Sequence, residues 1–113
     1  MHGPFCEIMV KEVLPVLRSL LAKRLSEFGL SQKKVAEKMG TTQPAVSQYK
    51  KGLRGSKTSL LEDNREVLEK VDQIAKKLAS NQMAPQEVAF EFCEICGILE
   101  KDKTFLEKIT GSK

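Results

Sequence analysis

The stretch that most constrains the fold is Leu30–Gly52, which reads "LSQKKVAEKMGTTQPAVSQYKKG". Two short helices can cross closely when a small residue lies at the crossing and a glycine takes the turn between them. Ala36 and Gly40 meet these two demands, and Val46 supplies a branched apolar side chain that packs back under the first helix. The spacing predicts a helix-turn-helix, although an αα-hairpin without a ligand has the same apolar spacing.

Local signals predict where the two helices begin and end. Ser31 is a typical N-cap for the first helix, and Gly40 is a typical C-terminal glycine. Thr42 is suited to cap the second helix, so that Gln43 and Pro44 fall in its first turn. A proline there loses no hydrogen bond, because the first backbone N–H groups of a helix have no intrahelical partner. We expect Pro44 to fix the start of this helix and the direction of Gln43.

The rest of the chain also has helical periodicity, and no run shows the two-residue alternation of a strand. Before the motif, we predict a helical segment that ends at Gly29 and is either kinked at Pro15 or consists of two pieces, the second of which starts near Pro15. After the motif, we predict a helix with an apolar stripe over Leu60–Leu78, a helix from Pro85 to about Leu99, and a short helix at Asp102–Ile109. The sequence therefore predicts an all-α fold. We expect residues 1–57 to form the DNA-binding region, and residues 58–113 to pack on it, to dimerise, or both.

Positive charge is concentrated in one part of the chain. Residues 31–57 carry seven basic side chains and one acidic side chain, whereas residues 58–113 carry eight basic and eleven acidic ones. A local basic patch on an otherwise mixed surface is typical of a protein that binds a polyanion. The other interpretation of this charge is a solvated lysine-rich face that has no partner.

Composition and length exclude several other classes of protein. The chain has 113 residues, of which 41% are hydrophobic and 30% are charged, as in one small globular domain. No apolar run reaches the roughly 18 residues of a membrane span, and the start lacks the features of a secretory leader. We therefore expect a cytoplasmic protein without a membrane partner. No nucleophile lies beside a base, and the acidic residues have the spacing of a helix surface, so we expect no enzymatic activity.

The motif also resembles a known family. Leu30–Gly52 shares the pattern "LSQ…VA…KMG…Q…V" with the helix-turn-helix of the lambda-repressor and Cro-like (XRE-type) regulators. The resemblance implies a lambda-repressor-like bundle with additional C-terminal helices. It also implies a sequence-specific transcription regulator whose recognition helix, Thr42–Tyr49, enters the major groove of DNA. With "CEI" near its start and "CEIC" near its end, the whole chain is most similar to small archaeal transcription regulators.

The same resemblance implies roles for particular residues. Gln32 would bond a phosphate and brace the recognition helix, and the Gln43 amide would read a base, for which adenine N6 and N7 are suitable partners. Pro44 replaces a hydrogen-bonding serine of the family pattern, and its ring is suited to a thymine methyl group. The candidate base contacts are Gln43, Pro44, Ser47 and Gln48. The candidate phosphate contacts, which set affinity and register, are Gln32, Lys33, Thr42, Lys50, Lys51 and Arg54.

A single unit of this kind reads only a few base pairs, so we expect a homodimer on double-stranded DNA. Its half-sites would lie about 34 Å apart or a multiple of that. The Leu60–Leu78 stripe is wide enough to form the dimer seam, with Asn64 as a polar residue that sets the register. Packing of the stripe on the DNA-binding region is the other interpretation. The alternative function is a helix-turn-helix adaptor that docks on the transcription machinery through the acidic C-terminal half.

The three cysteines form the second candidate site. Cys93 and Cys96 are a CxxC pair on one helix face, and Cys6 lies far away in sequence. Three thiolates are one ligand short of a closed zinc site, so His2, Glu94 or a partner's cysteine would complete it. An iron–sulfur cluster with an unusual fourth ligand is a second form of this metal interpretation. The other interpretations are core packing, since reduced cysteine is often buried, and redox or disulfide chemistry.

Overall fold

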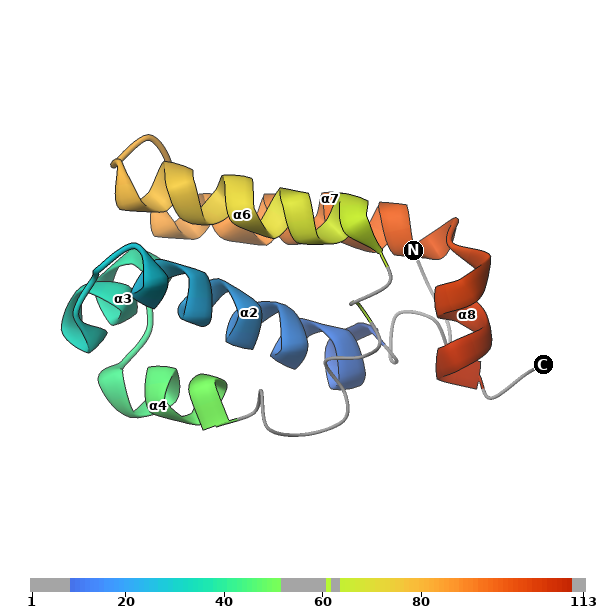
Figure 1. Ribbon diagram of the computed structural model, residues 1–113, viewed down its shortest axis with the longest axis horizontal. Helices are drawn as coiled ribbons and strands as arrows, with labels where there is room; N and C mark the ends of the chain where they lie inside the picture. The colour runs from blue at the N-terminus through green and yellow to red at the C-terminus, as the bar shows by residue number, and fades with distance from the viewer. Residues whose placement is uncertain (1–8, 52–60, 62–63, 111–113) are drawn as a thin grey trace.

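The computed structural model describes residues 9–51, 61 and 64–110, and within these residues every regular element is a helix (Figure 1). The elements are the π-helical turn η1 (Met9–Val13), α2 (Leu14–Glu27), α3 (Gln32–Met39), α4 (Gln43–Lys51), α6 (Arg65–Ala79), the 3-10 turn η4 (Pro85–Glu87), α7 (Val88–Glu100) and α8 (Lys103–Thr110). The prediction of an all-α fold is confirmed. Among the described residues, no helix combines the length and the apolar character that crossing a bilayer requires.

Helix α2 lies in the middle of the molecule and contacts α3 and α4 on one side and α6 on the other (Figure 1). Pro15 lies in its first turn, directly after η1, so the expected second start near this proline is confirmed. The buried side chains of all the longer helices form one core: Val16, Leu17, Leu21, Ala22 and Leu25 of α2, Val35 and Ala36 of α3, Val46 of α4, Val67, Val71, Ile74, Ala75 and Leu78 of α6, Phe92, Ile95 and Leu99 of α7, and Phe105 of α8. The predicted DNA-binding and C-terminal regions therefore share a core.

The predicted ends of α3 are confirmed. The Ser31 Oγ accepts a 3.2 Å hydrogen bond from the backbone N–H of Lys34, as expected of an N-cap. Gly40 ends the helix in the left-handed region, with a φ of 69°. A Cβ at Gly40 would lie only 3.2 Å from the Cβ of Pro85, so glycine is favoured here both by backbone conformation and by a close neighbour.

The predicted start of α4 is confirmed as well. The Thr42 Oγ1 accepts a 3.3 Å hydrogen bond from the backbone N–H of Ala45, and Gln43 is the first helical residue. Pro44 therefore occupies the first turn, where it removes no helical hydrogen bond. Gly52, the last residue of the motif, lies outside the described residues.

The stripe expected over Leu60–Leu78 packs inside the molecule. Val67, Val71, Ile74, Ala75 and Leu78 are buried where α6 contacts α2 and α3, which leaves them unavailable to a dimer seam, whereas Leu68 is exposed. Asn64 does not lie on the helical stripe but caps α6, because its Oδ1 accepts a 3.0 Å hydrogen bond from the N–H of Val67. Its Nδ2 donates to Asp102 Oδ2 at 2.7 Å, which links the start of α6 to the start of α8.

Two groups of ion pairs hold α6 in place. On the α2 side, Arg24 Nε donates to Asp72 Oδ1 at 2.7 Å, and Lys76 lies 3.4 Å from the other carboxylate oxygen. On the α7 side, the Lys70 amino group lies 3.0 Å from Glu91 and 2.5 Å from Glu94. Helix α6 is thus fastened by charged groups to both of its neighbours, outside the apolar core.

Candidate nucleic-acid interface

Helix α4 lies on the side of α2 that is opposite to α6 and is thereby left open to solvent (Figure 1). Val46 is fully buried under α2 and α3, which fixes the rotation of α4 about its own axis. On the opposite face Pro44, Gln48 and Lys51 are exposed, and Ser47 is half-buried. These four residues follow the i, i+3, i+4, i+7 spacing of a single helix face. The structure therefore brings together three of the four candidate base contacts, Pro44, Ser47 and Gln48, on one outward stripe of α4, and Lys51 is the last residue of this stripe.

The fourth candidate base contact, Gln43, stands at the exposed start of α4. The side-chain Nε2 of Gln32 donates a 3.0 Å hydrogen bond to the backbone oxygen of Gln43. This bond ties the first residue of α3 to the first residue of α4, as the bracing expected of Gln32 requires. No other described residue bonds the Gln43 side-chain amide, so its donor and its acceptor both remain available.

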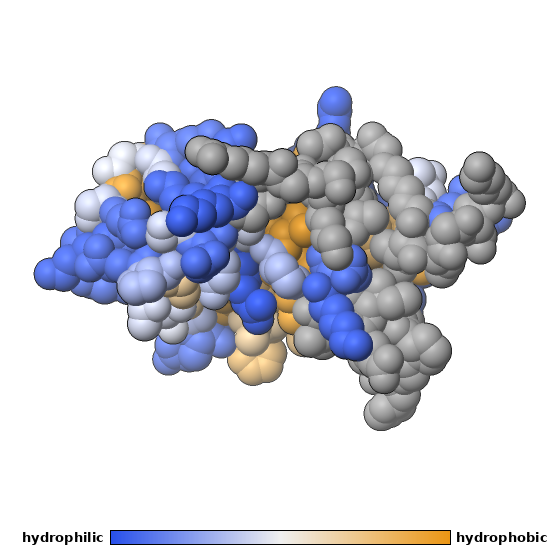
Figure 2. Space-filling model, turned by 90° about the horizontal axis from the view of Figure 1, so that it is seen from below, coloured by the Kyte–Doolittle hydropathy of each residue, from blue (hydrophilic) through white to orange (hydrophobic). Residues whose placement is uncertain are grey.

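The surface around this stripe is polar and basic. Lys33, Lys50 and Lys51 are exposed, and none of them forms an ion pair with a described residue. Figure 2, which views the molecule from the side of α4, shows a mostly hydrophilic face over α3 and α4. Arg54, the remaining basic candidate, lies outside the described residues. Unpaired cations beside an exposed polar helix face are suited to contact phosphates.

Groups with shifted pKa values lie elsewhere among the described residues. Hydrogen bonding from Arg24 lowers the pKa of Asp72, and hydrogen bonding from Lys70 lowers the pKa of Glu94. Hydrogen bonds to Glu27 and Asp72 raise the pKa of Arg24, and those to Glu94 and Glu91 raise the pKa of Lys70. These four groups hold α6 against its neighbours and are not part of the α4 stripe, so their shifts reflect structural ion pairing.

The two described cysteines of the CxxC pair differ in burial. Cys93 is exposed on α7, whereas Cys96 is half-buried and packs against the core. Cys6 lies outside the described residues, so a site shared by all three cysteines stays a prediction. Within the described part of the chain, no group of three or more histidine, cysteine, aspartate or glutamate side chains is arranged to hold a metal ion.

The structure also adds a residue that sequence reasoning placed only as a helix start. Pro85 of η4 lies against Gly40, in the turn between the two helices of the motif. The whole of α4 and the whole of α6 lie between these two positions in the sequence, so no local sequence signal connects them. The turn that sets the angle between α3 and α4 is thus supported by the C-terminal half.

The arrangement of α3, the glycine turn and the exposed α4 is that of a helix-turn-helix. In agreement, residues 20–62 match the family described as helix-turn-helix, a match that runs from the middle of α2 to beyond the end of α4. The matched segment is thus similar to this family, and the described helices have the lambda-repressor-like, all-α fold. No curated protein and no solved structure was found to be similar to the chain.

Proposed function

We propose that the protein is a sequence-specific transcription regulator that inserts α4 into the major groove of double-stranded DNA and acts as a homodimer. The observation that carries this proposal is the hydrogen bond from Gln32 to the backbone of Gln43. It fixes the exposed N-terminal end of α4, which is the end that contacts base edges in helix-turn-helix proteins.

Base reading is assigned to the outward stripe and to Gln43. The Gln43 amide offers both a donor and an acceptor, the pair needed for adenine N6 and N7. The Pro44 ring is exposed beside it and is suited to a thymine methyl group. Ser47 and Gln48 continue the same face one turn further along α4, where they reach the neighbouring base pair.

Phosphate contacts are assigned to the groups around the stripe. An amide NH2 group has two donors, so Gln32 can bond a phosphate with the second while the first holds Gln43. Lys33, Lys50 and Lys51 are exposed on either side of the recognition helix. Thr42 lies at the helix start, and Arg54 follows α4 in sequence. These contacts fix orientation and affinity but carry no sequence information.

The experiment that tests this proposal is a selection from random double-stranded oligonucleotides with the purified full-length protein. We expect enrichment of one sequence as an inverted repeat, with half-sites about one helical turn apart or a multiple of that. Enrichment of a single half-site would support base reading and contradict the homodimer. Recovery of no sequence would contradict base reading and would favour the adaptor function, in which the domain docks on protein.

A further inference from the structure

A hollow of about 190 Å³ lies where the helix-turn-helix meets the C-terminal half of the chain. It is lined by residues of α2, α3, α4 and the turn of the motif on one side, and by residues of η4 and α7 on the other. Met39, Val88 and Phe92 give it an apolar wall. Its volume corresponds to about six water molecules, so only a small ligand fits.

Three residues with polar side chains also line this hollow: Arg18 of α2, Thr41 of the turn and Tyr49 of α4. Arg18 is half-buried, and no described residue forms an ion pair or a hydrogen bond with its side chain. The hydroxyl groups of Thr41 and Tyr49 likewise have no hydrogen-bond partner among the described residues. A guanidinium group stays charged in proteins and only donates hydrogen bonds, so it is suited to an anion. An apolar wall with a few polar groups that lack partners is typical of a small-molecule site.

We propose that this hollow is an effector site for a small organic acid, whose carboxylate pairs with Arg18 and whose apolar body packs against Met39, Val88 and Phe92. Arginine can bind a carboxylate through two parallel hydrogen bonds, which makes this pairing both strong and directional. The Tyr49 hydroxyl can donate a further hydrogen bond to the same group. The binding site itself is independent of the proposed function, whereas its role in regulation rests on that function.

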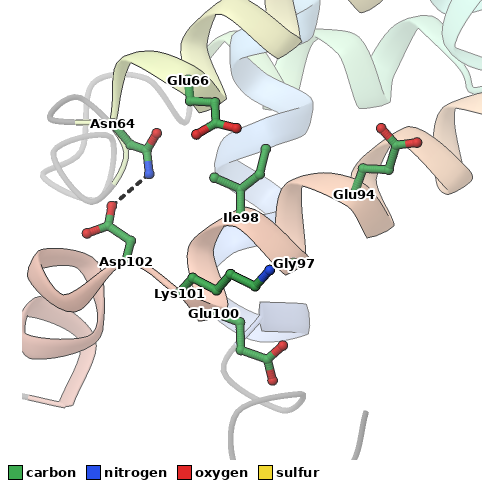
Figure 3. A pocket seen from close by; sticks show the side chains of 8 residues that line it. All are labelled: Asn64, Glu66, Glu94, Gly97, Ile98, Glu100, Lys101 and Asp102. Carbon is green, nitrogen blue, oxygen red and sulfur yellow. Dashed lines mark hydrogen bonds between the residues drawn. The ribbon is translucent and has the colours of Figure 1, made fainter.

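Charge favours an anion in this hollow and opposes one in a larger hollow of the same molecule. Among the described residues that line the hollow at Arg18, none is acidic. The larger hollow lies between the start of α6 and the end of α7, and Figure 3 shows that it is lined by Lys101 and by the carboxylates of Glu66, Glu94, Glu100 and Asp102. An organic acid is repelled by these carboxylates and attracted to Arg18. The acidic hollow therefore serves as an internal control.

The position of the hollow connects its occupancy with DNA binding. Tyr49 belongs to α4, the helix that we assign to DNA, and Thr41 belongs to the turn before it. Pro85, which lies against Gly40 of that turn, lines the same hollow. A ligand that joins Arg18 on α2 to Tyr49 on α4 stabilises the arrangement in which α4 faces outward. We therefore expect the acid to raise operator affinity and, by linkage, the operator to raise affinity for the acid.

The test is an NMR titration of the full-length protein with benzoate, a small aromatic acid, and with benzamide, its uncharged counterpart. With benzoate we expect saturable shifts of the backbone amide signals of Thr41, Tyr49 and Ala89, and a dissociation constant in the millimolar range because the ligand is small. Benzamide should bind about tenfold more weakly, since it lacks the charge that pairs with Arg18. The signals of Gly97 and Lys101, at the acidic hollow, should not move.

Three results of this titration would overturn the inference. The first is the absence of a saturable shift with benzoate, and the second is equally strong binding of benzamide. The third involves inorganic sulfate as a further probe. If sulfate moved the same amide signals as strongly as benzoate does, Arg18 would be a site for any anion, such as a phosphate of the DNA backbone, and the apolar wall would have no role.

Variants identify the residues of the site. Arg18→Met removes the charge and should weaken benzoate binding about tenfold or more, without a fall in melting temperature because no ion pair is lost. Ala89→Leu should also weaken binding, because it fills the rim of the hollow with a residue that favours the helix. Arg65→Met makes the matched change at an exposed arginine of α6 that does not line the hollow, and it should leave binding unchanged. Undiminished benzoate binding in Arg18→Met would overturn the assignment.

Fluorescence anisotropy with labelled operator tests the regulatory role separately. At matched ionic strength, saturating benzoate should raise the operator affinity of the wild type about fivefold and leave that of Arg18→Met unchanged. If benzoate bound at the hollow and the operator affinity of the wild type did not change, the effector role would be refuted. If the protein selected no operator at all, the proposed function would fail, whereas the NMR titration would still decide whether the hollow binds an acid.

Discussion

The side-chain amide of Gln32 and the backbone carbonyl of Gln43 are joined by a 3.0 Å hydrogen bond between the first residues of α3 and α4. Each of these residues also lies at a capped helix start, Gln32 after Ser31 and Gln43 after Thr42. The angle between the two helices is therefore fixed at their N-terminal ends as well as by the buried Val46. The end of α4 that we assign to DNA is held in place before any DNA is present.

Replacing Gln32 should loosen this end. Gln32→Ala removes one hydrogen bond, which is worth about 1 kcal/mol, and we expect operator affinity to fall about fivefold or more, because the phosphate contact is lost too. Fluorescence anisotropy with labelled operator measures this change. Gln73→Ala alters an exposed glutamine on α6, far from α4, and should not change affinity. Equal affinities of Gln32→Ala and the wild type would show that the bond has no role in recognition.

Substitutions of Gln43 and of Lys51 should have different effects on DNA binding. Gln43→Ala should reduce discrimination between the operator and random DNA by about 1–3 kcal/mol, since a bidentate base contact is lost. Lys51→Ala should weaken binding to both DNAs alike and reduce the slope of log affinity against log salt by about 0.9. Titrations at several salt concentrations separate the two effects. If Gln43→Ala weakened operator and random DNA by the same factor, its base-reading role would be refuted.

Gly40 should be more sensitive to substitution than Gly29. Both have positive φ, at 69° and 95°, so alanine is disfavoured at each by about 1–2 kcal/mol. Only at Gly40 does the added Cβ approach another residue, Pro85, at 3.2 Å, whereas at Gly29 it meets nothing within 4 Å. We expect Gly40→Ala to lower the free energy of unfolding more than Gly29→Ala in urea titrations. If both variants lost the same free energy of unfolding, then η4 would move away from the added Cβ at position 40 without loss of stability.

Acid should weaken the attachment of α6. The folded state lowers the pKa of Asp72 below its ordinary 3.8, through hydrogen bonding from Arg24 and then Lys76, and lowers that of Glu94 below 4.5. A lowered carboxyl pKa contributes stability that is complete above the ordinary value and is lost as the pH falls through the lowered one. Melting temperature should therefore fall as the pH drops below about 4.

Asp72→Asn removes part of this acid dependence and identifies its source. The variant should melt at a lower temperature than the wild type near neutral pH, and the difference should shrink at low pH. Glu69→Gln changes an exposed carboxylate that has no ion pair with a described residue, so it should leave the melting curve in place. A constant difference between Asp72→Asn and the wild type at every pH would exclude the ion pair as its cause.

Local sequence signals predicted the motif well, because caps, turn glycines and a first-turn proline act within a few residues of where they stand. Ser31, Gly40 and Thr42 lie where the sequence indicated. Asn64 was misplaced because it precedes Val67 and Val71 by three and seven residues. The N-cap position shares this spacing with a helical stripe, and periodicity cannot distinguish the two.

Hydrophobic periodicity could not predict the contacts between segments that are distant in the sequence. Core packing was one of the interpretations of the cysteines, yet Cys93 is exposed while Cys96 packs against the core, because the packing of α7 decides which of its apolar residues are buried. In the same way, the hydrogen bond from Asn64 to Asp102 forms only because the turn between α7 and α8 places Asp102 beside the start of α6. The DNA contacts themselves stay predictions.

The neighbour of Gly40 has a consequence for protein engineering. The turn of the motif is supported by Pro85 from the far half of the chain, so residues 30–52 are not a self-sufficient module. A graft that moved only these residues into another scaffold would keep the base-reading side chains and lose the support that sets their angle. Transfer of the specificity to a new host therefore requires a surface that replaces η4 as well as the two helices.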